Sequence, residues 1–296
     1  MTRPGFLLVT FAACLLGLAT AAFSGVPLAL PQALATVLLA LMAHAGANVL
    51  NDYHDARNGA DEANTEGLFP FSGGSRLIQQ GAVSLSATGR WAAVLLLLLV
   101  PGGLWLTWYS GPGLIGIGLA GLLLAWAYSA PPLQLMCRGL GELAVGLAWW
   151  LMVIGADYVQ RQAFAPLPAV AGLGQALLLA NILVINGFPD ARADASVGKR
   201  TLVVRLSRRG AAWCYLALGL LAHGWLGWAV WQGWAPNAVL GGLLSLPLSL
   251  AAAVLLIQRA DTPARLRPAI ALTIGAATLH ALAMATTLVL AIAGKA

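Results

Sequence analysis

Charged side chains are scarce in this sequence. Only 9% of its 296 residues are charged, 60% are hydrophobic, and the mean hydropathy is +0.83. Soluble domains carry about 25% charged residues. A chain with so little charge has too few polar side chains to cover a core of this size. The composition therefore excludes a water-soluble globular protein and predicts an integral membrane protein.

Cysteine is also rare, and its placement excludes two further classes of protein. Cys14, Cys137 and Cys214 show no CxxC or Cys/His metal spacing, so we expect small apolar packing residues rather than a disulfide framework or a zinc site. Arg3 precedes a long apolar run that lacks the short hydrophobic region and cleavage site of a signal peptide. This run is therefore expected to remain as the first membrane span.

Long apolar runs make up most of the chain. A bilayer core of about 30 Å requires about 20 apolar residues per helix. Breaks at proline, glycine and charge clusters predict an all-α integral membrane protein with about nine spans in a single domain, residues 1–296. The predicted spans are residues 6–24, 32–50, 91–109, 113–128, 142–160, 168–187, 211–230, 239–257 and 269–291.

The distribution of basic residues predicts the orientation of these spans. With the N-terminus in the cytoplasm, 14 of the 16 basic residues face inward, and only Arg161 and Lys295 face outward. This asymmetry follows the positive-inside rule. The longest connections, 51–90 and 188–210, then lie on the cytoplasmic side. We therefore expect a protein of the cytoplasmic (inner) membrane whose active site faces the cytoplasm.

The few acidic residues are concentrated in two segments. Seven of the ten lie within 52–66 and 190–194, at the ends of the second and sixth predicted spans. Asn51 and Asp55 are four residues apart, as are Asn186, Asp190 and Asp194, so each set shares one helix face. A polar stripe that enters the membrane must face a cavity or other helices. Two residues, His44 and Asn48, continue the first stripe into the membrane.

Several carboxylate and amide oxygens that converge are suited to Mg²⁺, which commonly bridges to substrate phosphates. Basic side chains near both segments are candidate phosphate donors. The offset of four spans between the segments predicts two related halves, about 1–165 and 166–296. Pro189 is expected to kink or interrupt the sixth span just before Asp190.

These motifs resemble those of the UbiA superfamily of intramembrane prenyltransferases. "NDYHD" (51–55) and "NGFPDARAD" (186–194) resemble its two Asp-rich motifs, and the nine-span layout also fits. "NDYHDARNGAD" (51–61), "YSAPPLQLMCRGLGE" (128–142) and "GKRTLVVRL" (198–206) are most similar to the MenA branch, the 1,4-dihydroxy-2-naphthoate polyprenyltransferases.

The resemblance implies a helical bundle with a central cavity open to the cytoplasmic side, in which two Mg²⁺ ions bind a polyprenyl diphosphate. The implied catalytic residues are Asp52, Asp55, Asp190, Asp194 and Tyr128, although Tyr128 is equally interpreted as an interfacial tyrosine. The implied metal ligands are Asn51, Asp52, Asp55, Asn186, Asp190 and Asp194. The predicted substrate-binding residues are Asn48, Arg76, Arg138, Arg192, Lys199 and Arg200.

Two segments depart from the pattern of the superfamily. The loop after Tyr128 carries Gln134 and Met136 where many relatives have a basic residue, which leaves Arg138 as its only charge. This puts in doubt a basic diphosphate ligand in that loop. Asp61 follows Asp55 by six residues, whereas some members place the next aspartate four residues later. Its role stays open, as an indirect contact or as a ligand through water.

The predicted function is Mg²⁺-dependent transfer of a polyprenyl group from an allylic diphosphate to an aromatic acceptor. The resemblance points to 1,4-dihydroxy-2-naphthoate and menaquinone biosynthesis, with membrane lipids and no nucleic acid as partners. The alternatives are another aromatic acceptor, a membrane terpene cyclase, and a transporter. A transporter more often places ionisable groups near mid-membrane, whereas here they lie at helix ends.

Three further polar residues, His44, His54 and Asp157, are interpreted from their positions in the sequence. His44 either lines a cavity or bonds a neighbouring helix, and His54 is expected at the surface because it lies off the Asn51/Asp55 face. Asp157 is predicted to face outward or to pair with Arg161. The oligomeric state and the prenyl chain length are left open.

Overall fold

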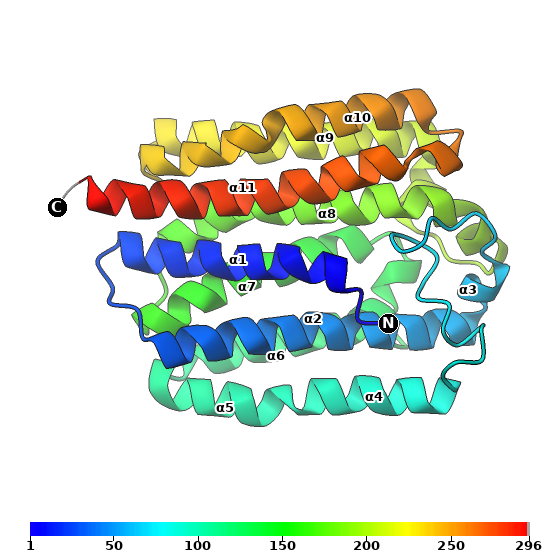
Figure 1. Ribbon diagram of the computed structural model, residues 1–296, viewed down its shortest axis with the longest axis horizontal. Helices are drawn as coiled ribbons and strands as arrows, with labels where there is room; N and C mark the ends of the chain where they lie inside the picture. Colours follow the sequence, from blue (N-terminus) through cyan, green and yellow to red (C-terminus); the bar gives the residue numbers. More distant parts are fainter. Residues whose placement is uncertain (295–296) are drawn as a thin grey trace.

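The computed structural model describes residues 1–294, and all the regular structure in this range is helical. The helices run side by side along the long axis of the molecule (Figure 1). The α-helices are α1 Pro4–Phe23, α2 Leu30–Asn58, α3 Ala60–Ala63, α4 Leu85–Leu97, α5 Leu99–Ser110, α6 Gly113–Ser129, α7 Gly141–Arg161, α8 Pro166–Ser196, α9 Leu202–Trp231, α10 Leu246–Arg259 and α11 Arg267–Ala293. Three 3₁₀ segments are η1 Leu135–Cys137, η2 Asn237–Ser245 and η3 Pro263–Arg265.

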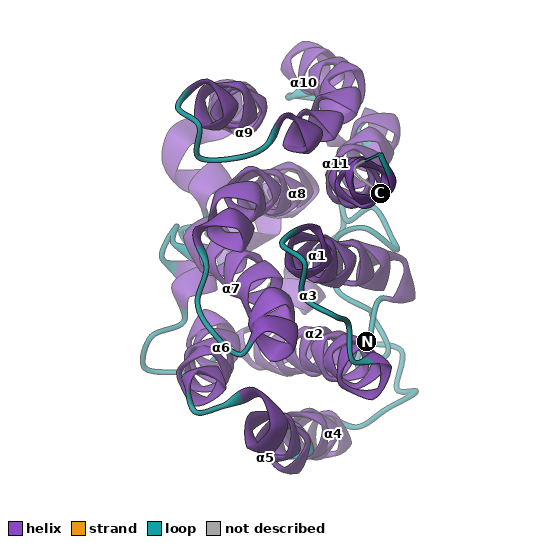
Figure 2. Cartoon of the chain, turned by 90° about the vertical axis from the view of Figure 1, so that its left-hand side faces the viewer, coloured by secondary structure: helices purple, strands orange, loops and turns teal. Residues whose placement is uncertain are grey.

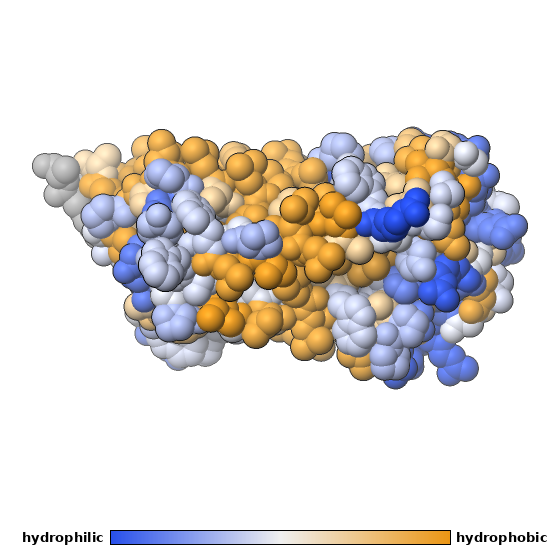
Figure 3. Space-filling model, turned by 90° about the horizontal axis from the view of Figure 1, so that it is seen from below, coloured by the Kyte–Doolittle hydropathy of each residue, from blue (hydrophilic) through white to orange (hydrophobic). Residues whose placement is uncertain are grey.

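The helices within residues 1–294 support a membrane-spanning bundle. Eight helical stretches are long and apolar enough to cross a bilayer, where α4 with α5 and η2 with α10 each count as one. The remaining predicted span corresponds to α6, an apolar helix of only 17 residues. Hydrophobic side chains form the broad middle of the surface, and hydrophilic ones gather toward its ends (Figure 3). The fold class is therefore all-helical and membrane-spanning.

Proline does not interrupt the sixth span. The helix α8 continues through Pro189 to Ser196, so the prediction of an interruption there was wrong. Proline removes one backbone donor, but neighbouring helices make it tolerable within a membrane bundle, and both Phe188 and Pro189 are buried here. A break lies instead in α9, where Ser207 has φ 63° and ψ 164°.

Small residues let the central helices pack closely. Viewed along the bundle, α1 lies between α2 and α11, with α7 and α8 beside it (Figure 2). Gly17 of α1 meets the backbone of α7 so closely that a Cβ there would collide with the carbonyl of Val153. Ala12, Ala13 and Leu16 on the same helix are fully buried. Close contact of this kind stabilises helix pairs in a membrane through van der Waals packing. The hydrophobic effect contributes little there, because lipid tails are as apolar as the side chains that leave them.

A buried ion pair closes the end of the bundle where α1 finishes. Arg161 donates from Nε to Asp157 Oδ1 at 2.6 Å and from Nη2 to Oδ2 at 2.7 Å. Thr20 of α1 donates to the same carboxylate at 2.9 Å, and Arg161 also bonds Ser24 at 3.0 Å. Asp157 is 1% exposed. The predicted pairing with Arg161 is confirmed, and the outward-facing alternative is wrong.

Candidate active site

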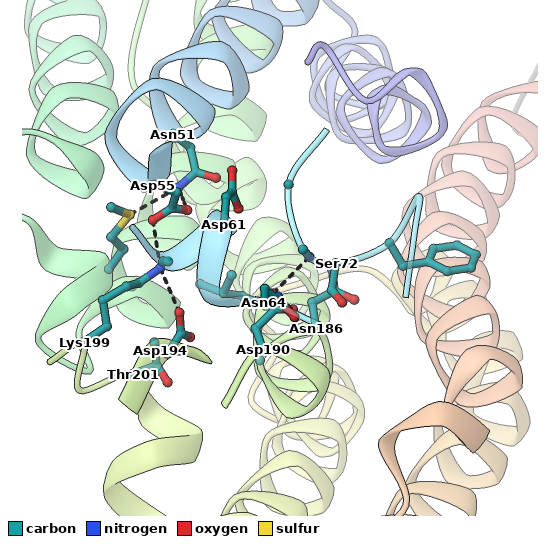
Figure 4. Close-up of a pocket in the computed structure, with 18 of the residues that line it drawn as sticks. Asn51, Asp55, Asp61, Asn64, Ser72, Asn186, Asp190, Asp194, Lys199 and Thr201 are labelled. Atoms are coloured by element: carbon teal, nitrogen blue, oxygen red, sulfur yellow. Dashed lines mark hydrogen bonds and ion pairs between the residues drawn. The ribbon is translucent and has the colours of Figure 1, made fainter. Parts of the chain in front are cut away.

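The two acidic motifs meet at the opposite end of the bundle. Asn51 and Asp55 are on the last turns of α2, which stays helical to Asn58, and the second motif is on the last turns of α8. Together they line a cavity of about 100 Å³. Figure 4 shows the two sets of side chains facing each other. The polar residues of this cavity include Arg3, Asn51, Asp55, Asp61, Asn64, Ser72, Tyr128, Glu142, Asn186, Asp190, Asp194, Lys199 and Thr201.

Lys199 joins the two motifs. Its Nζ lies 2.9 Å from Asp55 Oδ1 and 3.0 Å from Asp194 Oδ1, so one ammonium bridges carboxylates from α2 and α8 (Figure 4). The side chain is buried. Burial alone would lower the pKa of Lys199, but the charges of Asp55 and Asp194 raise this pKa well above its ordinary value. Lys199 is therefore a stable cation at the centre of the candidate site.

Arg3 contacts two neighbouring residues of the first motif. Its Nη2 donates to Asn51 Oδ1 at 3.0 Å and to Asp52 Oδ1 at 2.7 Å. Asp52 is 1% exposed and is absent from the cavity lining, whereas Asn51 and Asp55 line the cavity. Around the helix Asp52 lies about 100° from Asn51 and about 60° from Asp55, and its carboxylate bonds Arg3 at the edge of the cavity.

Asp190 is held by the loop that follows α3. Asn64 donates to its Oδ1 at 2.7 Å, and the backbone N–H of Gly73 donates to Oδ2 at 3.3 Å. Arg76 fixes this loop by donating to the carbonyl oxygens of Asp61 at 2.8 Å and of Asn64 at 2.7 Å. The guanidinium of Arg76 thus braces the loop next to the cavity, although Arg76 is not among the residues that line it.

The role of Asp61 was left open by the sequence, and the structure places this residue in the cavity. It is 5% exposed, and a Cβ on Gly74 would collide with its carboxylate, which explains a glycine at φ 70°. Burial raises the pKa of Asp61 to about 7, with further contributions from the carboxylates of Asp55 and Asp52. Asp61 therefore joins Asp55 as the second carboxylate that α2 and α3 contribute to the cavity lining.

The other predicted substrate-binding residues lie outside this polar cavity. Arg192 pairs with Glu66 at 2.9 Å and is 81% exposed, and Arg138 donates to the carbonyl of Pro132 at 2.7 Å from an exposed position. Arg200 is exposed, and Asn48 lines a different, apolar chamber. Their contacts with substrate stay predictions. Lys199 is the predicted basic residue that the structure places in the cavity.

An apolar chamber of about 210 Å³ adjoins the polar cavity. The two share five lining residues, Arg3, Asn51, Tyr128, Leu183 and Asn186. A larger apolar groove of about 310 Å³ between α2, α5, α6 and α7 shares lining residues with the chamber in turn. The polar cavity, the chamber and the groove therefore follow one another from the end of the bundle into its apolar middle.

His44 meets both of its interpretations, because it lines the chamber and also bonds a neighbouring helix. Its Nδ1 lies 2.8 Å from Thr10 Oγ1, and its ring packs edge-on to Trp149 with centroids 4.8 Å apart. His54 was expected at the surface, and this was wrong, since it is 7% exposed. Its ring packs edge-on to Tyr53. The side of α2 that turns away from Asn51 and Asp55 is therefore also buried at this position.

One of the two unusual residues after Tyr128, Met136, lies against the first motif. Met136 is buried and lines the cavity, and its sulfur accepts a hydrogen bond from Asn51 Nδ2 at 3.1 Å. Gln134 occupies a left-handed conformation at φ 43° just before η1. A neutral thioether therefore contacts Asn51 from this loop.

The oxygen atoms of the cavity fit a divalent metal ion. Asn186 Oδ1 and Thr201 Oγ1 are buried and have no hydrogen-bond partner within the described chain. Unpartnered buried oxygens are costly unless a ligand satisfies them, and Mg²⁺ takes oxygen ligands. Among residues 1–294, however, no three His, Cys, Asp or Glu side chains are close enough together to hold an ion. The donor chemistry fits Mg²⁺, while Lys199 lies between the two sets of carboxylates.

Several residues of the cavity were not predicted from the sequence. Arg3 lies far from both motifs in the sequence, and Thr201 follows the second motif. Asn64 lies in a loop of ordinary composition. Only their approach to the motifs in three dimensions identifies them. The available signal for Arg3 was a cation placed directly before the first membrane helix, in a chain with few charges.

Comparison with known proteins identifies relatives over most of the chain. The UbiA prenyltransferase family matches residues 7–274. The 1,4-dihydroxy-2-naphthoate octaprenyltransferase of Escherichia coli is 31% identical over 71% of this chain and 68% of its own length. The enzyme of the same name from Haemophilus influenzae is 28% identical over 80% of this chain and 76% of its own length.

A solved structure supports the fold. The UbiA homolog from Archaeoglobus fulgidus bound to GPP and Mg²⁺ has a TM-score of 0.63 and 15% sequence identity, and the match covers 97% of this chain and 100% of that one. At this identity the likeness concerns the fold alone. It extends over the whole bundle, including the helices that carry both acidic motifs.

Proposed function

This chain belongs to the UbiA prenyltransferase family, and on that premise we propose that it transfers a polyprenyl group from an allylic diphosphate to 1,4-dihydroxy-2-naphthoate. Family membership makes the chain an integral membrane prenyltransferase, which removes the transporter alternative. The choice of acceptor is supported by the relatives named above, which match about three quarters of the chain at about 30% identity. Such a reaction belongs to menaquinone biosynthesis.

The observation that carries this proposal is the junction between the polar cavity and the apolar chamber. A polyprenyl diphosphate has a highly charged head and a long apolar tail. The polar cavity presents oxygen atoms and one buried ammonium, and the chamber and groove present apolar side chains such as Leu183 and Met152. Tyr128 lines both spaces, so it lies where head and tail would join.

The donor set assigns residues to the expected Mg²⁺. Asp55 from α2 and Asn186, Asp190 and Asp194 from α8 would hold it, and two ions are expected from the family resemblance. When bound, the metal neutralises the diphosphate and makes it a better leaving group. Asn51 orients Asp55 by donating to its Oδ2 at 2.9 Å, while Asn64 and Gly73 orient Asp190.

The chain's own residues then keep the reacting carbon away from water. The bond from C1 of the prenyl group to the diphosphate oxygen breaks, and a bond from C1 to the electron-rich ring of the acceptor forms. The ring loses CO₂ from its carboxylate. Trp149, Leu179 and Ile182 surround the chamber with apolar surface, which protects an allylic cation from hydrolysis. Tyr128 is placed to contact either the cation or the leaving group.

The same proposal includes a location. With the N-terminus in the cytoplasm, the acidic ends of α2 and α8 lie on the cytoplasmic side of the inner membrane, where soluble acceptor and Mg²⁺ are both accessible. The charge asymmetry of the sequence supports this orientation. The end of the bundle that holds the polar cavity is called the site end, and Arg209 lies near it. The cysteine of an Arg209→Cys variant should react with a membrane-impermeant thiol reagent in inverted but not in right-side-out vesicles.

The activity is tested with purified protein, Mg²⁺, allylic diphosphates of several lengths and a panel of aromatic acids, with products identified by mass spectrometry. We expect a prenylated product from 1,4-dihydroxy-2-naphthoate that depends on Mg²⁺ and releases pyrophosphate. A product from another acid alone would reassign the acceptor. A cyclised hydrocarbon formed without acceptor would replace the transferase by a terpene cyclase, and no product from any acceptor would refute the proposal.

A further inference from the structure

The bridge made by Lys199 occupies the position where the two acidic motifs come together. Asp55 belongs to α2 and Asp194 to α8, and both Oδ1 atoms contact the same ammonium, at 2.9 and 3.0 Å. Asp55 is otherwise occupied as well, because Asn51 donates to its Oδ2 at 2.9 Å and Asn58 to its Oδ1 at 3.3 Å. A metal ion that joins the motifs therefore has to compete for oxygens that already have partners.

Two cations cannot share these oxygens without strong repulsion. Like charges a few ångströms apart repel strongly inside a protein, and a divalent ion repels an ammonium twice as strongly as a single charge does. The ammonium of Lys199 therefore has to leave Asp55 and Asp194 before an ion can bind between them. Within residues 1–294, no three His, Cys, Asp or Glu side chains are close enough together to hold an ion, and between Asp55 and Asp194 the ammonium occupies the space.

The ammonium of Lys199 stands at the end of a flexible side chain beside open space. Lys199 lies in the five-residue link between Ser196 of α8 and Leu202 of α9. Gly198 precedes it at φ 78°, and a Cβ there would meet nothing within 4 Å. The backbone of the link is held, since Lys199 N–H bonds Asp194 O and Arg200 N–H bonds Cys137 O, both at 2.9 Å. Rotation of the four-carbon side chain would carry the ammonium away from the carboxylates without breaking these backbone bonds.

We propose that Lys199 is a built-in counter-ion that bridges Asp55 and Asp194 in the metal-free protein and is displaced when divalent metal binds. The ammonium holds α2 and α8 together while the carboxylates have no metal, and its release leaves it free for the diphosphate that arrives with the metal. This inference deepens the proposed function and rests on it for the identity of that diphosphate. The competition between Lys199 and metal needs no substrate, so it is measured without one.

The first test uses wild-type protein and the small number of its lysines. The sequence contains two, Lys199 and Lys295. We expect an amine-acetylating reagent to modify Lys199 slowly after treatment with EDTA and several-fold faster after addition of Mg²⁺, with the modification of Lys295 as the internal reference. Mass spectrometry of the peptides gives both rates. If no concentration of Mg²⁺ exposes Lys199 relative to Lys295, the displacement is refuted.

The second test measures metal binding directly, with Mn²⁺ as the probe and electron paramagnetic resonance as the readout, in the absence of any prenyl diphosphate. Lys199→Gln should lower the Mn²⁺ midpoint by about tenfold, within the usual range of couplings between mutually exclusive ligands. Lys199→Arg, which keeps the charge, should stay close to wild type. Arg209→Gln is the matched control, because it removes one exposed positive charge from the first turns of α9.

Thermal unfolding separates a counter-ion from a merely structural lysine. In EDTA, Lys199→Gln should unfold at a lower temperature than wild type, because Asp55 and Asp194 then face each other unpaired. Saturating Mg²⁺ should remove most of this difference. A deficit of equal size with and without Mg²⁺, or an unchanged Mn²⁺ midpoint, would overturn the proposal. Product formation by wild type alongside an unchanged midpoint would reject the counter-ion and keep the proposed function, whereas a shifted midpoint without any product would do the reverse.

Discussion

The bundle contains a buried ion group at each end, and the two groups differ in the number of carboxylates that share one cation. At the far end, Arg161 holds Asp157 through two parallel hydrogen bonds, and Thr20 adds a third to the same carboxylate. At the site end, one ammonium is shared between Asp55 and Asp194. Unpartnered oxygens of Asn186 and Thr201 lie in the same cavity.

The difference separates a structural contact from an exchangeable one. A planar guanidinium matches a carboxylate in two bonds at once, whereas an ammonium acts as a point charge that can be replaced by another cation. Asp157 and Arg161 join α1 to α7 and line none of the three cavities. Buried charge alone therefore does not distinguish the candidate site, whereas one ammonium shared by two carboxylates beside a cavity does.

The largest effect is expected when the acidic motifs at the site end lose a charge. Asp55→Asn and Asp190→Asn should each lower prenyl transfer by at least about 10³-fold, comparable to the loss of a key electrostatic group in other enzymes. Asparagine has nearly the same shape as aspartate, so both variants should keep the fold. Initial rates of product formation, read by mass spectrometry, give the measurement. Glu62→Gln, an exposed neutralisation beside Asp61, should keep its activity; near-normal turnover of Asp190→Asn would reject the site.

At the far end the expected loss is one of stability. Asp157→Ala leaves Arg161 without its carboxylate and should cost about 3–5 kcal/mol of unfolding free energy. Thermal unfolding in detergent should show this loss equally with and without Mg²⁺, while the folded fraction keeps its turnover per molecule. The double change Asp157→Leu with Arg161→Leu should recover much of the stability. A variant rescued by Mg²⁺ would contradict the assignment of this end as structural.

The raised pKa of Asp61 predicts that the stability of the protein depends on pH. Because the folded-state pKa of Asp61, about 7, lies above its ordinary value of 3.8, the folded protein binds this proton more tightly than the unfolded chain does. Stability should therefore fall as pH rises through this range, by about 3 kcal/mol between pH 5 and pH 8 in EDTA. Asp61→Asn should flatten that slope, measured by unfolding at both pH values. An unchanged slope would show that Asp61 does not titrate there.

The smallest expected effect concerns the apolar space between the two ends. Gly121 of α6 lines both the chamber and the groove, and a Cβ there would meet nothing within 4 Å. Gly121→Leu should narrow the passage without disturbing its neighbours. We expect about a tenfold loss of kcat/KM with a long prenyl diphosphate, a difference of about 1.4 kcal/mol, and little change with a ten-carbon one. Equal losses for both lengths would place the tail elsewhere.

The sequence was sufficient to predict the helical bundle and the helix face of each acidic motif, because both depend on local pattern, and the matched positions of the motifs at helix ends led to the prediction that they meet. Apolar runs determine the spans, and the spacing of Asn51 from Asp55 and of Asn186 from Asp190 fixes the faces of two helices. Asp52 stays a predicted metal ligand, and in the structure its carboxylate accepts a hydrogen bond from Arg3. The turn of about 100° per residue directs Arg192, which lies between Asp190 and Asp194, away from the cavity.

What could not be predicted depends on contacts between distant segments. The bridge from Lys199 to Asp55 joins residues 144 positions apart, and the bond from Asn64 to Asp190 joins residues 126 apart. No local pattern encodes these approaches. The continuity of α8 through Pro189 has the same origin, since packing by neighbouring helices decides whether a proline interrupts a membrane helix.

The lengths of α2 and α8 have a consequence for where the reaction takes place. They contain 29 and 31 residues, and at about 1.5 Å per residue each extends about 45 Å, well beyond a hydrocarbon layer of about 30 Å. The last turns of both helices, which carry the acidic motifs, therefore reach the level of the lipid headgroups. A polyprenyl diphosphate in the bilayer is an amphiphile with its charge at that same depth. The enzyme can receive it without lifting the tail out of the lipid or drawing the charge into it.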